Sequence, residues 1–367
     1  MFTIKRHDNA MNLNTAPRAL QWFHRLATPL VPDDYLELVN PQWSSRALNA
    51  RVVALQPQPG GATTVTLQPP PRWGGFRAGQ FVNVSLSVAG IRQTRCYSIC
   101  SAPGKVNNRF DITVKAIEGG RVSNQVNTQL RVDDVVEISE AQGDFTWGDP
   151  LPERALFISA GSGITPLMGM AQEAAAAGVL PNLVWLHYAP AADEVMFSEA
   201  LDALKARHPQ LDLQIIHTRA SGEHFSATAL MRRCPDWRLR RAWACGPGVM
   251  LDAAVSLWSE VADAQALTIE RFQPKVATLA DLAGGKLAFA NTGCIVESDG
   301  KTSILEAAEA AGLTPKYGCR MGICHGCTVR LKAGQVRDLR TGKQFGEEDD
   351  LIQICVCAPA GDVELAL

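Results

Sequence analysis

The chain has 367 residues, which is long for one domain and suits two or three. A formal net charge of −2 gives no reason to expect nucleic acid or anionic lipid as a partner. No apolar run approaches the ~18–20 residues of a membrane span. Residues 1–14 lack the apolar centre of a secretory signal, so a cytoplasmic protein is expected. Ten cysteines without an export signal favour metal ligation over disulfides, because half of them crowd into the last fifty residues.

The first half of the chain predicts a lead segment and then a barrel. Residues 1–47 form the lead segment, with a short helix expected at 18–26 that packs on the body of the protein. Between residues 48 and 150, runs of β-branched residues alternate with Gly and Pro turns, a pattern typical of an antiparallel β-barrel. The expected strands are 51–55, 63–67, 80–86, 110–116 and 135–139.

The second half predicts two further domains. From residue 151 to 274, short buried strands alternate with helical stretches, which indicates a parallel α/β sheet. Residues 275–285 are expected to be a linker. Residues 286–367 then form a separate mixed domain with two strands, a helix near 304–311, a cysteine loop and a final strand.

The cysteine loop is the strongest motif. Cys319, Cys324 and Cys327 have the C-x4-C-x2-C spacing of plant-type [2Fe–2S] ligands, which lets three thiolates on one loop reach the same cluster. Glycines in the loop permit left-handed turns and let backbone N–H groups approach the sulfurs. A zinc site would pair two similar C-x2–4-C units, and a redox disulfide between Cys324 and Cys327 would leave Cys319 unexplained. Spacing alone leaves the fourth ligand open between Cys355 and Cys357.

Residues 354–362 resemble the closing strand of plant-type ferredoxins, as the cysteine loop resembles their cluster loop. In that family the fourth ligand lies four residues before a proline, here Pro359. The resemblance therefore implies that Cys355 completes the ligand set and that Cys357 is a spare buried thiol. It also implies a β-grasp α+β fold for residues 286–367.

Two short motifs indicate a flavin site. Arg95, Tyr97 and Ser98 follow a strand, and Gly120-Arg-Val-Ser123 opens a helical stretch at the proper distance. Each motif alone is ordinary for a strand or a turn. Together they resemble the FAD domain of the ferredoxin–NADP reductase superfamily.

This resemblance implies a role for each residue. Arg95 would pair with the flavin pyrophosphate, Tyr97 would lie against the isoalloxazine or ribityl chain, and Ser98 would hydrogen-bond N5, which accepts hydride. Ser123, as the N-cap, would leave helix N–H groups free for the second phosphate. The remaining implied contacts with FAD, which the second motif favours over FMN, are Val114, Lys115, Gly120 and Val122.

Two later motifs indicate a nucleotide site. Gly161, Gly163 and Thr165 lie between a buried strand and a helix, the context of a phosphate-binding turn. The following Pro166 departs from the G-x-G-x-x-G fingerprint but matches the form found in the superfamily named above. The resemblance places the cysteine of Cys245-Gly246-Pro247 beside the nicotinamide.

The nucleotide itself is inferred from the end of a strand. Thr218 and Arg219 stand where NADP-using relatives place a hydroxyl and an arginine around the 2′-phosphate. No acidic residue stands at this strand end to hold a free 2′-hydroxyl. NADPH is therefore favoured over NADH.

The resemblance covers residues 48–367 and implies a chain of electron carriers. NADPH gives a hydride to FAD at a site made by Ser98, Cys245 and Phe272, and single electrons pass through the [2Fe–2S] cluster to a partner protein. Residues 28–41 resemble the lead segment of desaturase-linked reductases, which favours a membrane fatty-acid desaturase as the acceptor, met by transient docking. The alternative is the NADH-using reductase of a ring-hydroxylating or other monooxygenase. Two other functions fit the sequence less well. A nitric-oxide-detoxifying reductase would need a haem domain, and none is found in the sequence. A zinc-binding module would be colourless, whereas flavin and iron–sulfur groups absorb visible light.

Overall fold

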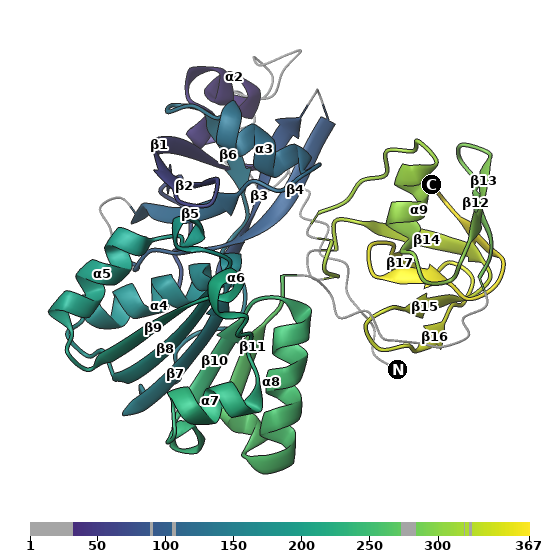
Figure 1. Cartoon of the computed structure of the whole chain (residues 1–367). Coiled ribbons are helices and arrows are strands. Elements are labelled where there is room, and N and C mark those ends of the chain that lie inside the picture. Colours follow the sequence, from purple (N-terminus) through teal and green to yellow (C-terminus); the bar gives the residue numbers. More distant parts are fainter. Residues whose placement is uncertain (1–31, 89–90, 105–107, 273–283, 319, 323–324) are drawn as a thin grey trace.

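The computed structural model describes residues 32–88, 91–104, 108–272, 284–318, 320–322 and 325–367. Three sheet domains follow one another in this part of the chain: an antiparallel barrel, a parallel sheet and a mixed sheet (Figure 1). The predicted multidomain class is therefore confirmed. No helix in the described residues is long and apolar enough to cross a membrane.

The lead segment is described only from residue 32 onward. The helix expected at 18–26 lies outside the described residues. Helix α2 (Pro32–Val39) and the 3-10 turn η2 (Pro41–Trp43) precede the barrel. The Gln42 side chain donates to the Gln68 carbonyl at 2.9 Å, and the Asn49 amide donates to the Pro41 carbonyl at 2.8 Å. These bonds hold this end of the lead segment on the barrel.

Six strands form the barrel in the order β4-β3-β6-β1-β2-β5, and all neighbours are antiparallel. An isolated antiparallel bridge between Ile99 and Ile112 joins the two ends of this order. The elements are β1 (Leu48–Gln58), β2 (Ala62–Gln68), β3 (Phe81–Val88), β4 (Ile91–Ser98), β5 (Phe110–Lys115), α3 (Arg121–Thr128) and β6 (Val135–Ile138).

Strand β4 corrects one expectation, because the motif Arg95–Ser98 lies within a strand and not after one. The run 92–95 reads Arg-Gln-Thr-Arg and has no apolar alternation, the usual sequence signal of a strand. The tertiary structure supplies the partners instead. Gln93 is buried, and the hydroxyls of Ser85 and Thr94 are 2.6 Å apart across the β3–β4 pair.

The second domain is a parallel sheet in the order β11-β10-β7-β8-β9. Helices cover both faces, since Leu167 and Leu201 pack on one side and Leu230 and Leu251 on the other. The elements are β7 (Arg154–Ala160), η4 (Gly161–Gly163), α4 (Ile164–Ala176), β8 (Asn182–Ala189), η5 (Ala192–Glu194), α5 (Ser198–Arg207), β9 (Leu211–His217), α6 (Thr218–Ser221), α7 (Ala227–Arg233), η6 (Trp237–Leu239), β10 (Arg241–Cys245), α8 (Gly248–Val261), η7 (Ala264–Ala266) and β11 (Leu267–Glu270).

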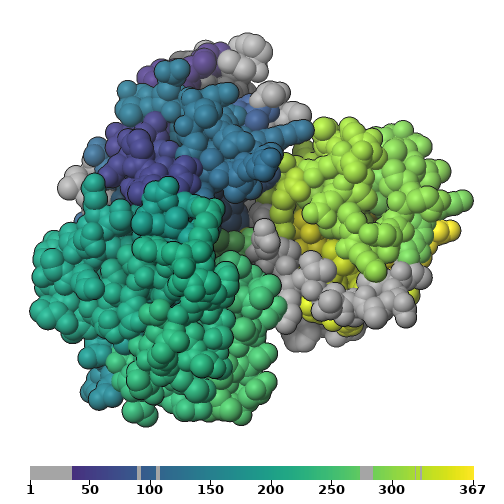
Figure 2. Space-filling view, in the orientation of Figure 1, coloured from purple at the N-terminus to yellow at the C-terminus, as the bar shows by residue number. Residues whose placement is uncertain are grey.

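The barrel and the parallel sheet share a buried core. The indole of Trp243 donates to the Thr146 carbonyl at 3.1 Å, and that of Trp147 donates to the Met170 carbonyl at 2.9 Å. Helix α4 lies so close to the barrel that a Cβ on Gly169 would come within 2.7 Å of the Ile99 carbonyl oxygen. Figure 2 shows these two domains as one continuous body, with the C-terminal domain as a separate lobe beside it.

The C-terminal domain has its own core, whose buried members run from Leu287 to Leu365. Its mixed sheet has the order β13-β12-β19-β14-β17, with β12 parallel to β19, and a small sheet β16-β15-β18 stands beside it. This matches the expected β-grasp class. The elements are β12 (Gly285–Phe289), β13 (Cys294–Ser298), α9 (Ile304–Ala310), β14 (Thr328–Ala333), β15 (Val336–Asp338), β16 (Gln344–Phe345), β17 (Leu351–Gln353), β18 (Cys357–Pro359) and β19 (Val363–Leu365).

The linker expectation needs one correction, because Gly285 is the first residue of β12. A Cβ on Gly284 would lie 1.8 Å from the Ser298 carbonyl oxygen, and one on Gly285 would lie 2.2 Å from the Gly361 backbone. These glycines are therefore required by close packing and not by a flexible connection. The rest of the expected linker, except Gly284, lies outside the described residues.

Candidate active site

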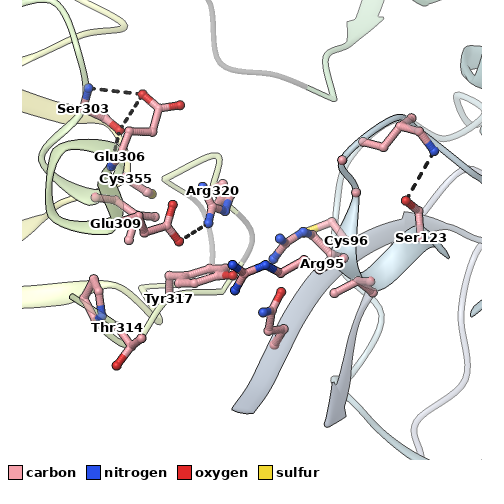
Figure 3. Close-up of a pocket in the computed structure, with 18 of the residues that line it drawn as sticks. Arg95, Cys96, Ser123, Ser303, Glu306, Glu309, Thr314, Tyr317, Arg320 and Cys355 are labelled. Atoms are coloured by element: carbon pink, nitrogen blue, oxygen red, sulfur yellow. Dashed lines mark hydrogen bonds and ion pairs between the residues drawn. The ribbon is translucent and has the colours of Figure 1, made fainter. Parts of the chain in front are cut away.

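Strand β4 brings the first motif to a cavity between the barrel and the C-terminal domain. The cavity holds about 940 Å³, within the ~300–1,000 Å³ of small-molecule sites. Arg95 lines it (Figure 3), and Tyr97 lines it as well. Burial raises the pKa of Tyr97 to about 12, so its hydroxyl keeps the proton at neutral pH. Phe272, which follows β11 and is 36% exposed, lines the same cavity. The size and the lining suit a flavin.

The start of helix α3 faces this cavity, but its cap differs from the prediction. The N-cap is Gly120, and Ser123 is the third residue of the helix, within its first turn. The Ser123 hydroxyl accepts from the Ile117 backbone N–H at 3.4 Å, so it closes the preceding turn instead of capping the helix. Gly120 and Ser123 both line the cavity, as does Val122. A phosphate contact at this helix end stays a prediction.

Strand β5 contributes one of the two expected residues. The Val114 side chain is 1% exposed and packs in the barrel core, so the structure does not bring it into the cavity. Its neighbour Lys115 points the other way, lines the cavity and forms an ion pair with Glu194 at 3.3 Å. Alternation along the strand explains the difference, because successive side chains point to opposite faces.

The two predicted nucleotide motifs lie against each other at the carboxyl end of the parallel sheet. Gly161 has φ 52, and a Cβ on Gly163 would lie 2.1 Å from the Cys245 carbonyl oxygen. The Thr165 hydroxyl donates to the Ser162 carbonyl at 2.9 Å and so stabilises the turn. On the other side, a Cβ on Gly246 would lie 3.2 Å from the Ala160 Cβ. Only glycines permit this approach of the two loops.

Pro247, the third residue of the later motif, is the N-cap of helix α8. It follows β10 at the carboxyl end of the sheet, where ligands of open α/β sheets bind. The nucleotide motifs thus share one edge of the sheet, as their sequence context predicts.

A carboxylate joins the barrel to this edge. The Ser98 hydroxyl donates to Glu270 Oε2 at 3.3 Å, and the Cys245 thiol lies 3.9 Å from the same oxygen. Glu270 and Cys245 are paired in register on the parallel strands β11 and β10. Burial raises the pKa of Glu270 to about 8 and also raises the pKa of the fully buried Cys245 thiol. Ser98, Glu270 and Cys245 therefore form a protonated hydrogen-bonding cluster at the junction of the barrel and the parallel sheet.

The raised pKa of Glu270 predicts a pH dependence of stability. Between about pH 5 and 8 the folded chain keeps a proton that the unfolded chain releases, so the free energy of unfolding falls as pH rises. The slope from this group is at most about 1.4 kcal/mol per pH unit. Glu270→Gln is expected to remove this slope. Urea unfolding at fixed FAD concentration, followed by the fluorescence of the buried Trp185 and Trp243, measures it. If the free energy of unfolding falls with pH equally in the natural protein and in Glu270→Gln, the raised pKa is not that of Glu270.

The expected 2′-phosphate residues lie directly after β9. They do not end the strand as expected, because β9 ends at His217 and Thr218 and Arg219 begin helix α6. Arg219 forms an ion pair with Glu194 at 2.8 Å, and Glu194 also pairs with Lys115. The expectation that no acidic residue stands here is therefore wrong, because η5 folds Glu194 beside β9 from 25 residues earlier in the chain.

Two of the four expected cluster cysteines are described, and Cys319 and Cys324 lie outside the described residues. The sulfurs of Cys327 and Cys355 are 3.1 Å apart, and both side chains are buried. Two thiolates on one tetrahedral metal atom at ~2.3 Å lie ~3.8 Å apart, so this pair would have to separate by only ~0.7 Å to share a metal atom. Cys355 also borders the cavity, whereas Cys357 begins β18 and pairs in register with Asp338.

In the cysteine loop, residues other than glycine also adopt the left-handed backbone conformation. Gly322 has φ 72, as expected for a glycine, and Arg320 and His325 have φ 60 and 55. Such values are uncommon for residues with a side chain and mark a tightly constrained loop. The donor set and this geometry fit an iron–sulfur cluster.

Comparison with known proteins agrees with each part of the chain. Residues 63–147 match the oxidoreductase FAD-binding domain model, residues 157–255 the oxidoreductase NAD-binding domain model, and residues 290–360 the 2Fe-2S iron-sulfur cluster binding domain model. A protein of Mycobacterium tuberculosis (strain ATCC 25618 / H37Rv) named NADPH oxidoreductase is 39% identical over 93% of this chain and 90% of its own length.

Two further matches cover most of the chain. The ferredoxin reductase component of 3-ketosteroid-9-alpha-monooxygenase from the same organism is 31% identical over 80% of this chain and 85% of its own length. The structure of phthalate dioxygenase reductase, described as modular for electron transfer from pyridine nucleotides to [2Fe-2S], superimposes with a TM-score of 0.58. It covers 88% of this chain and 98% of its own at 22% identity, which shows the shared fold.

The fold and the site define an oxidoreductase that joins a flavin barrel, a nucleotide-binding sheet and an iron–sulfur domain. The chain belongs to the ferredoxin–NADP reductase family members that are fused to a C-terminal [2Fe–2S] ferredoxin. Electrons in this family run from NAD(P)H through FAD to the cluster.

Sequence reasoning missed three residues at these sites: Glu270, Glu194 and Tyr317. A signal existed for Glu270, because an acidic side chain at the carboxyl end of a parallel strand lies where ligands bind in such sheets. Glu194 and Tyr317 carry no motif of their own. Only folding brings them to Arg219 and Arg95.

Proposed function

We propose that the chain takes a hydride from NADPH on FAD and delivers single electrons through its [2Fe–2S] cluster to the oxygenase component of a monooxygenase system. One observation carries this proposal. A single cavity is bordered by Tyr97 of the flavin motif, by Phe272 and by Cys355 of the cluster motif. Because the flavin motif and a cluster cysteine border the same cavity, the two cofactors would be neighbours, which supports electron transfer within one chain.

The residues of the chain bind and orient in this proposal, while the cofactors supply the redox chemistry. Arg95 offers a guanidinium to a pyrophosphate at the cavity wall. Ser98 and Glu270 hold a proton at the edge that the flavin ring and the nicotinamide would share. Cys245 is fully buried beside them, so its thiol is shielded from solvent.

NADPH is proposed as the donor for two reasons. Arg219 is 71% exposed at the carboxyl end of β9, where a 2′-phosphate can reach it. The relative that is 39% identical is named NADPH oxidoreductase. Glu194 opposes this choice, since a phosphate must share the guanidinium with its carboxylate. Glu194 would thus set how strongly NADPH is preferred.

The oxygenase acceptor is preferred to the desaturase that the lead segment suggested. The relative at 31% identity is named as part of a ketosteroid monooxygenase, and one at 30% identity from Escherichia coli (strain K12) as a subunit of phenylacetyl-CoA epoxidase. Of the desaturase-like stretch 28–41, residues 28–31 lie outside the described residues. The named relatives therefore favour the oxygenase alternative.

The proposal is tested by reconstitution. The full chain loaded with FAD and cluster is mixed with NADPH, oxygen and candidate oxygenase components, and product is measured against NADPH consumed. Cys327→Ser is the matched control, because it removes one expected ligand and leaves the reductase domains untouched. We expect product with the intact chain and none with the control. Turnover by a desaturase in membranes and by no oxygenase would overturn the acceptor class.

A further inference from the structure

The segment just before the cysteine loop reaches across the cavity to the flavin motif. Tyr317 is separated from Cys319 by one residue. The guanidinium carbon of Arg95, on β4 of the barrel, lies 5.1 Å from the centre of the Tyr317 ring. Figure 3 shows Arg95 extending from the barrel toward this tyrosine of the C-terminal domain. A cation within ~6 Å of a ring centre is attracted by the ring face.

A second cation and its counter-ion hold the ring. The guanidinium of Arg320 lies 4.1 Å from the centre of the Tyr317 ring, and Arg320 is paired with Glu309 of helix α9. Arg320 has φ 60, a left-handed conformation that is uncommon for a residue with a side chain. Glu309 neutralises Arg320, which otherwise would repel Arg95 near the same ring. The tyrosine is thereby fixed to the domain that carries the cluster.

The contact has consequences because the two bodies have separate cores. The buried core of the C-terminal domain contains only residues of that domain. Its position against the barrel must therefore come from surface contacts, and Arg95–Tyr317 joins the two faces of the cavity. The same face of the C-terminal domain presents Cys355 to the cavity.

We propose that Tyr317 is a positioning residue that seats the cluster loop at the flavin cavity by stacking against Arg95. This inference rests on the proposed function. Two electrons leave NADPH with the hydride, and the cluster takes up one electron at a time. Two successive transfers therefore complete one donor oxidation, and the proton goes to solvent. The rate of each electron transfer falls steeply with the distance between the cofactors, so the position of the cluster loop controls this rate.

The test uses the full chain loaded with FAD and cluster, in anaerobic stopped flow with NADPH. Tyr317→Leu removes the ring, and Tyr317→Phe keeps it as the matched control. In Tyr317→Leu we expect cluster reduction to slow about 10-fold or more, because small misplacements of reacting groups are costly. The midpoint potential of the cluster is expected to stay unchanged, and flavin reduction by NADPH, measured in the same traces, is expected to slow far less than cluster reduction. Tyr317→Phe is expected to behave as the natural protein.

Cluster reduction at the natural rate in Tyr317→Leu would overturn the inference. If Tyr317→Leu loses its cluster, Glu309→Gln is the second test. Glu309 lies outside the cysteine loop, and without its charge Arg320 is expected to repel Arg95. Slower cluster reduction with an unchanged cluster spectrum then supports the seat, and an unchanged rate refutes it. A natural protein that reduces its flavin but never its cluster would instead refute the proposed function.

Discussion

Cys355→Ser is expected to abolish the iron–sulfur cluster, and Cys357→Ser is expected to keep it. The Cys355 sulfur lies 3.1 Å from that of Cys327, the last cysteine of the C-x4-C-x2-C loop, and it borders the flavin cavity. A serine at 355 leaves a metal atom one thiolate short, and soft thiolates are the ligands that iron–sulfur clusters require. Cys357 lies in strand β18, where it is a buried member of the domain core and does not line the cavity.

Iron and sulfide content, with the visible and electron paramagnetic resonance spectra, measure this result. The Cys355→Ser chain should still oxidise NADPH with ferricyanide, because the flavin and nucleotide residues are untouched. It should fail with one-electron protein acceptors that depend on the cluster. Cys357→Ser is the matched control, because it makes the same substitution at a cysteine that is also buried. Loss of iron in Cys357→Ser and its retention in Cys355→Ser would reverse the ligand assignment.

Arg219→Ala is expected to lower the preference for NADPH over NADH by roughly 5- to 10-fold. A hydrogen bond between charged groups contributes ~1.5–3 kcal/mol, and solvent reduces this contribution because Arg219 is 71% exposed. The Michaelis constant for NADPH should rise, while that for NADH should change little. The ratio of kcat/KM for the two nucleotides measures the effect.

Glu194→Gln is the complementary variant and should shift the same ratio the other way. It removes the carboxylate that pairs with Arg219 at 2.8 Å, so the guanidinium is free for the 2′-phosphate. The glutamine keeps the side-chain length, and the substitution also removes the ion pair between Glu194 and Lys115. Equal changes of kcat/KM for NADPH and NADH in both variants would show that Arg219 and Glu194 do not distinguish the 2′-phosphate from the 2′-hydroxyl.

Much of the architecture followed from local pattern. Alternating strands and turns predicted the barrel, and short buried strands between helices predicted the parallel sheet, because these periods reflect which faces are buried. Strand β4 was not predicted, because its buried face is not marked by apolar residues. Its polar run 92–95 is kept in a strand by the Ser85–Thr94 hydroxyl pair and by buried Gln93, and neither partner can be read locally.

The sequence by itself determined the class of the protein and its FAD, nucleotide and [2Fe–2S] domains, because the turn residues of each motif and the first three cysteines are close together in the chain. Tertiary structure alone decided how the motifs meet. Ser98 and Glu270 are 172 residues apart, and they share a hydrogen bond only because the barrel and the parallel sheet pack into one core. Arg95 and Tyr317 meet only because the C-terminal domain docks across the cavity. Side-chain contacts between domains depend on the packing of whole surfaces, and no local period in a sequence records that packing.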